Sequence, residues 1–176
     1  MRTIKKVASH IFIDGFGGMT QGLFATLIIG TMIQQIGLLI GGSTGNVIYL
    51  LGKAAAALTS AGIGVGVAVK YGESPLVTVS AAVAAMVGGY AGKITGGTFF
   101  VDGNAVLAGP GEPLGAFIAA FAGITCGHLV SGKTKVDIIV TPVITIGAGS
   151  VVGLLVGPPI SQMMTCLLYT SPSPRD

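Results

Sequence analysis

Residues 109–142 read GPGEPLGAFIAAFAGITCGHLVSGKTKVDIIVTP, and this stretch decides how the rest of the chain is interpreted. It contains a glycine-proline loop with a carboxylate (Glu112), an apolar run that ends near His128, and a short basic turn. A second apolar run begins at Asp137. The role of these polar residues depends on whether the apolar runs form a soluble core or membrane spans.

The composition favours membrane spans. Charged residues make up 9% of the chain, against roughly 25% in an average soluble domain. Hydrophobic residues make up 51%, the mean hydropathy is +0.87, and there are 30 glycines. So few charged side chains could hardly cover the surface of a soluble domain of 176 residues. The sequence therefore predicts an all-α integral membrane protein.

Charge and motif content exclude several function classes. A net charge of +3, without a basic stripe carrying interleaved aromatic residues, does not indicate nucleic-acid binding. Cys126 and Cys166 suggest neither a disulfide framework nor a metal site. We expect no cofactor, no catalytic residue and no phosphorylated Cys or His. Residues 127–134, GHLVSGKT, fit a phosphate-loop pattern, but that motif requires a preceding strand, and here an apolar span precedes it.

About five apolar segments are long enough for membrane-spanning helices, which need about 20 residues each. We expect Pro142 to kink the last of them and Pro158-Pro159 to end it. Three sets of glycines spaced by four predict closely packed helices. The segments are 19–40, 47–69, 74–92, 113–131 and 137–157, and the glycines are Gly37, Gly41 and Gly45, Gly88, Gly92 and Gly96, and Gly149, Gly153 and Gly157.

Residues 94–112 are too rich in Gly and Pro to form a span. Within them, FFVDGNAVL matches a short β-hairpin with an Asp-Gly turn. Because such backbone cannot face lipid, the segment lies outside the bilayer or is buried as a re-entrant element that lines a cavity.

The distribution of Lys and Arg predicts a cytoplasmic N-terminus. In that orientation the cytoplasmic segments hold six basic residues and the outer loops hold only Lys93. The six are Arg2, Lys5, Lys6, Lys70, Lys133 and Lys135.

The last residues, 166–176, read CLLYTSPSPRD and change abruptly in composition. They resemble a translated sequencing adapter, so we separate them from a membrane domain over residues 1–165. The natural chain is then expected to continue, which would make this sequence truncated. The alternative is a genuine disordered polar tail.

Three segments resemble the membrane IIC subunit of the bacterial phosphoenolpyruvate-dependent sugar phosphotransferase system. The nearest group is the second IIC-type family, which includes proteins described as perfringolysin regulator-like, and the likeness covers the first half of such a protein. The resemblance implies an inner-membrane permease that binds a sugar and presents it to a cytoplasmic IIB protein for phosphorylation. The segments are GPGEPLGAF (109–117), LVSGKTKVDIIVTP (129–142) and VGPPIS (156–161).

Five polar residues are candidates for binding the substrate. Glu112 is similar to the Glu of the Glu-Pro motif in glucose-type IIC proteins, which contacts sugar, although the helix dipole alone would also favour a carboxylate there. Lys53 would either snorkel to the interface or face a polar cavity. His128 is either a packed or interfacial residue or a proton relay, and it is included among the candidates. Asn104 and Gln21 complete the set.

The leading hypothesis is therefore a sugar permease in the bacterial plasma membrane, working with cytoplasmic IIA and IIB proteins and forming a homodimer. Two alternatives stay open. One is a IIC-like membrane sensor or regulator without transport, and the other is an unrelated ion-coupled transporter.

Overall fold

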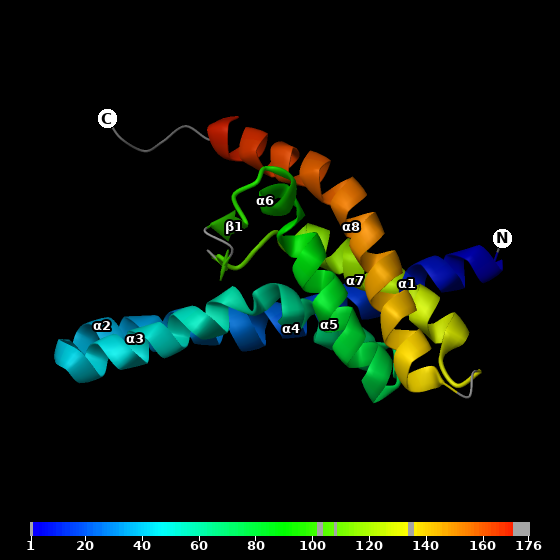
Figure 1. Cartoon of the computed structure of the whole chain (residues 1–176), viewed down its shortest axis with the longest axis horizontal. Coiled ribbons are helices and arrows are strands. Elements are labelled where there is room, and N and C mark those ends of the chain that lie inside the picture. The colour runs from blue at the N-terminus through cyan, green and yellow to red at the C-terminus, as the bar shows by residue number, and fades with distance from the viewer. Residues whose placement is uncertain (1, 102–103, 108, 134–135, 171–176) are drawn as a thin grey trace.

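The structure is a computed structural model of the chain. Three of its helices are long and apolar enough to cross a bilayer, or four if one bent pair counts as a span. The predicted all-α membrane fold is thus confirmed (Figure 1). The structure describes residues 2–101, 104–107, 109–133 and 136–170, with side chains from Ile13 to Met163 in those ranges and at Cys166.

The first half of the chain is a long helical hairpin. α1 (Arg2–Leu23), a π-helical turn (Phe24–Ile28) and α2 (Ile29–Ile40) run out without a break in the helix. Gly41 and Gly42, at φ 63° and 65°, reverse the chain, a backbone conformation that glycine adopts readily. α3 (Gly42–Ala57) and α4 (Thr59–Lys70) return beside α2 and α1.

Glycine pairs hold the two sides of this hairpin together. A Cβ at Gly18 would lie 2.5 Å from the Gly66 carbonyl oxygen, and one at Gly30 would lie 2.9 Å from that of Gly52. The helices therefore touch through their backbones, as small residues allow in lipid. The same holds for Gly22 with Gly62 and for Gly37 with Gly45.

The second half packs as a bundle of three helices, α5 (Pro75–Gly89), α7 (Pro113–Val130) and α8 (Asp137–Thr170). The hairpin end formed by α2 and α3 projects away from this bundle (Figure 1). Glycines again lie at the contacts, since a Cβ at Gly88 would meet Gly115 and one at Gly149 or Gly153 would meet α5 and α7. The predicted close packing of the helices is confirmed at these positions.

Two spans differ from the prediction. The segment expected over 47–69 is bent by 51° at Leu58, between α3 and α4. The segment expected over 74–92 is helical only from Pro75 to Gly89, and α6 (Ala91–Thr95) follows after a break at Tyr90. Both breaks contribute to the site described below.

The prediction that Pro158-Pro159 ends the last span was wrong, because α8 continues through both prolines to Thr170. Proline removes a helix hydrogen bond, but the second half of α8 packs on α6, with Gly157 against Ala91 and Ser161 against Gly92. We attribute the continuation to this packing. Part of the segment 166–176 is thus helical, and residues 171–176 lie outside the described residues.

The predicted hairpin is confirmed in the segment between α6 and α7. β1 (Phe100–Val101) pairs antiparallel with β2 (Asn104–Ala105), so that Phe100 faces Ala105 and Val101 faces Asn104. The Asp-Gly turn itself lies outside the described residues. After β2 the chain reaches the loop that precedes α7.

Candidate functional site

The loop Gly109–Glu112 lies where the two broken helices meet. The Glu112 amide donates a hydrogen bond to the Gly89 carbonyl oxygen (2.7 Å), at the last residue of α5. The Ser60 hydroxyl, in the first turn of α4, donates to the Pro110 carbonyl oxygen (3.0 Å). The loop is therefore held between the break that ends α5 and the bend that separates α3 from α4.

Two glycines give this loop its shape. Gly109 and Gly111 have φ values of 80° and 75°, in the left-handed region that disfavours other residues. A Cβ at Gly111 would also lie 2.5 Å from the Ser60 Oγ and 3.0 Å from the Gly89 carbonyl oxygen. Position 111 thus requires glycine for two independent reasons, and the loop cannot keep this path with a larger residue there.

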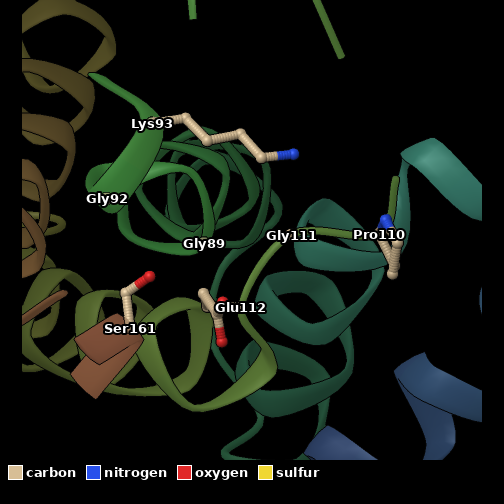
Figure 2. A pocket seen from close by; sticks show the side chains of 7 residues that line it. All are labelled: Gly89, Gly92, Lys93, Pro110, Gly111, Glu112 and Ser161. Carbon is tan, nitrogen blue, oxygen red and sulfur yellow. The ribbon is translucent and has the colours of Figure 1, made fainter. Parts of the chain in front are cut away.

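A cavity of about 240 Å³ opens beside the loop. Figure 2 shows Glu112 and Ser161 next to one another on one side of it, with the Lys93 side chain extending along the other. The Glu112 carboxylate makes no capping hydrogen bond to its own helix, so the capping role that a carboxylate often has before a helix does not occupy it. The walls are Gly89, Gly92, Lys93, Pro110, Gly111, Glu112 and Ser161.

The chemistry of this lining suits a polyhydroxylated ligand. A carboxylate accepts hydrogen bonds from hydroxyls, an ammonium group donates them, and a serine hydroxyl does both. Glycine at position 92 lets α8 approach closely, because a Cβ at Gly92 would meet the Ser161 side chain at 2.7 Å. The cavity, at about 240 Å³, is somewhat smaller than the range of about 300–1,000 Å³ for small-molecule sites.

The length of α5 limits how far the loop at Gly89 can lie from Pro75. α5 has 15 residues, which at about 1.5 Å per residue span roughly 22 Å, less than the hydrocarbon thickness of about 30 Å. If Pro75 lies at one interface, the loop at Gly89 cannot reach the other. Irregular backbone at that depth is tolerated where it is buried in protein or lines a cavity.

Of the five residues predicted to bind substrate, only Glu112 lines this cavity. Gln21 on α1 and Lys53 on α3 are exposed side chains of the long hairpin, and Asn104 is exposed in β2. The structure does not bring these three together with Glu112 in a described cavity. Their binding roles stay predictions.

His128 lies near the opposite end of α7, about 24 Å along the helix from Glu112. Its Nδ1 is 2.9 Å from the Glu73 Oε1, and the His128 side chain is 71% exposed while that of Glu73 is 9% exposed. A second, mainly apolar cavity of about 300 Å³ adjoins this pair and Tyr71. Burial, and then the nearby Asp14 carboxylate, raise the pKa of Tyr71.

Ser60, Tyr90 and Ser161 were not predicted from the sequence to be site residues. Lys93 served only to predict the orientation of the chain in the membrane. Ser161 could not have been found, because it follows two prolines that suggested the end of a helix. Tyr90 did carry a signal, since it is a lone aromatic residue after Gly88-Gly89 at the end of an apolar run.

The comparisons with known proteins agree with the membrane fold. A family model described as phosphotransferase system, EIIC, matches residues 13–170. No curated protein and no solved structure matches the chain. Because the family match covers most of the chain, the chain belongs to the EIIC family and is a membrane component of a phosphotransferase sugar-transport system.

Proposed function

We propose that the chain is a sugar permease subunit that binds its sugar in the cavity beside Glu112. The observation that carries this proposal is the Glu112 carboxylate, which lines a cavity together with Lys93 and Ser161. A carboxylate and an ammonium group on different sides of a small cavity can bind several hydroxyls of one sugar ring at once. The size of about 240 Å³ favours a single ring.

The surrounding fold supports translocation as well as binding. Secondary transporters place their substrate sites between discontinuous helices near the middle of the membrane. Here the bent α3–α4 pair and the interrupted α5–α6 pair both contact the Gly109–Glu112 loop. A movement of either pair would therefore change the position of Glu112.

The rest of the transport system follows from the family. We propose that a cytoplasmic IIB protein, supplied with phosphate by a IIA protein, phosphorylates the bound sugar, and that the chain acts as a homodimer in the plasma membrane. The N-terminus is proposed to be cytoplasmic, which places the turn after α7, with Lys133, on the same side as IIB. This orientation predicts that a cysteine at Gly132 reacts with an impermeant thiol reagent only from the cytoplasm.

The test is phosphoenolpyruvate-dependent sugar phosphorylation in membranes that contain the protein and its soluble partners. We expect Glu112→Gln to lower kcat/KM by about 10- to 150-fold, the range for losing a charged hydrogen-bond partner worth about 1.5–3 kcal/mol. The matched control is Glu73→Gln, which removes the carboxylate of the His128 pair at the far end of α7. Its rate should stay within twofold of the unmodified protein.

Normal activity of Glu112→Gln would refute the proposed site. Absence of phosphorylation across a panel of sugars, with the protein folded in the membrane, would favour the alternative of a IIC-like regulator. Uptake that requires a proton or Na⁺ gradient but no phosphoenolpyruvate would favour an ion-coupled transporter.

A further inference from the structure

Tyr90 occupies the break between α5 and α6 and is one of the most deeply buried side chains, with 1% of its surface exposed. It is not part of the cavity wall. Its hydroxyl nevertheless lies beside α3 and the loop before Glu112, and its ring lies beside Lys93 and Phe99.

The Tyr90 hydroxyl lies between two carbonyl oxygens from distant segments. It is 2.5 Å from the carbonyl oxygen of Gly109, in the loop before Glu112, and 3.1 Å from that of Ala57, the last residue of α3. The carbonyls of the last helical turn lack partners within their helix. A phenol has one hydrogen to donate, so it can bond only one of the two oxygens at a time.

The ring of Tyr90 contacts a residue of the cavity wall and the β-hairpin. The Lys93 Nζ lies 5.3 Å from the centre of the ring, within the range of a cation–π interaction. The Phe99 ring, at the base of the hairpin, lies 5.5 Å away. Phe99 is in turn bonded through its carbonyl oxygen to the Val106 amide.

We propose that Tyr90 is a positioning residue for sugar binding, whose hydroxyl couples the Glu112 loop to the bend between α3 and α4 and whose ring positions Lys93. This inference rests on the proposed function for its kinetic consequences, but not for its structural ones. Since the hydroxyl bonds either the loop or α3, movement of one segment changes the restraint on the other. Glu112 and Lys93 lie in different elements. Tyr90 contacts Gly109, in the loop before Glu112, and Lys93 itself.

The substitution Tyr90→Phe removes the hydroxyl and keeps the ring. Hydrogen–deuterium exchange of the membrane-embedded protein should show the amides of Glu112 and Leu58 both exchanging faster, each by at most about fivefold, because one hydrogen bond shared between the two segments is lost. The matched control is Tyr49→Phe, which removes a hydroxyl from α3 near the hairpin turn and should leave both amides unchanged. Tyr90→Leu also removes the ring, and should therefore make the Lys93 side chain more mobile as well.

In the phosphorylation assay, Tyr90→Phe should raise KM about fivefold and leave kcat within twofold of the unmodified protein. A purely structural defect would instead lower the amount of active protein, and hence the apparent kcat, at constant KM. Tyr90→Leu should raise KM further. Size-exclusion chromatography checks whether each variant is folded. If Tyr90→Leu does not fold, the result for Tyr90→Phe alone tests the proposal.

Unchanged exchange in Tyr90→Phe, or a fall in kcat without a rise in KM, would overturn the proposal. Failure of the proposed function has a different signature, because the unmodified protein would then bind no sugar. In that case the exchange measurement alone decides: faster exchange at both amides supports Tyr90 as the residue that positions the loop, and unchanged exchange refutes it.

Discussion

Replacing Gly111 by alanine tests the geometry of the site most sharply. Alanine in the left-handed region, where Gly111 has a φ of 75°, is destabilised by roughly 1–2 kcal/mol. Its Cβ would also lie 2.5 Å from the Ser60 Oγ, and overpacking of this kind typically adds about 1–3 kcal/mol. Together these effects destabilise the loop by about 2–5 kcal/mol.

Gly109→Ala is the matched control. Gly109 has a φ of 80°, but a Cβ there would meet nothing within 4 Å, so only the backbone cost of about 1–2 kcal/mol applies. The two variants should therefore differ by about 1–3 kcal/mol, which is roughly 5- to 150-fold in kcat/KM for sugar phosphorylation if the loop must hold this position to bind. Gly111→Ala should have the lower kcat/KM of the two variants.

The double variant Ser60→Ala/Gly111→Ala provides the decisive comparison. Ser60→Ala alone should lower activity, because it removes the hydrogen bond to the Pro110 carbonyl oxygen. In combination it removes the Ser60 Oγ, the atom closest to the new Cβ, and leaves only the longer contact with the Gly89 carbonyl oxygen, so the double variant should be more active than Gly111→Ala. Equal activity of the two glycine variants, or no recovery in the double variant, would refute the reasoning.

Two further predictions concern the packing of the helices, and both are checked by thermal unfolding in detergent. Gly22→Ala should lower Tm by about 2–12 °C, because its Cβ would collide with the Gly62 backbone at a cost of about 1–3 kcal/mol. Gly17→Ala, whose Cβ would meet only the Lys70 side chain at 3.9 Å, should match or exceed the stability of the unmodified protein, and equal losses in both would contradict the account. Thr145→Val should leave Tm unchanged or raise it, because the buried Thr145 hydroxyl has no hydrogen-bond partner among the described residues and valine has the same shape. A clear loss of stability would show that the hydroxyl is bonded after all.

Much of the fold could be predicted from the sequence because membrane helices depend on local composition. The apolar run before His128, the close packing at Gly88, Gly149 and Gly153, and the pairing of β1 with β2 all appear in the structure as expected. Each of these signals depends on neighbouring residues only. The bilayer requires backbone polar groups to be bonded within a segment, so local pattern decides the secondary structure.

The breaks in the helices could not be predicted, because they depend on contacts between distant segments. The bend at Leu58 lies in a mainly apolar sequence without proline, and α8 passes through Pro158 and Pro159 although proline usually ends a helix. In the structure the bend is contacted by the Gly109–Glu112 loop, and α8 is contacted by α6. Tertiary packing decided both cases.

The same limit applies to the candidate site. Glu112 could be chosen from the sequence because two prolines and two glycines around it mark an unusual loop. Lys93 and Ser161 lie 19 and 49 positions away in the sequence, and only the packing of α6 and α8 brings them to the same cavity. Gln21 and Lys53 were chosen for being polar within apolar runs, a criterion that does not determine which surface a side chain faces.

The central claim is that sugar binds in the cavity beside Glu112, and protection of a nearby thiol measures this most directly. The protein would carry Ser161→Cys in a background without Cys126 and Cys166, and the rate of maleimide labelling would be followed with and without sugar. We predict that a sugar phosphorylated by the same membranes slows labelling of position 161, with half-maximal protection near its KM. Labelling that stays equally fast at saturating sugar would contradict the claim.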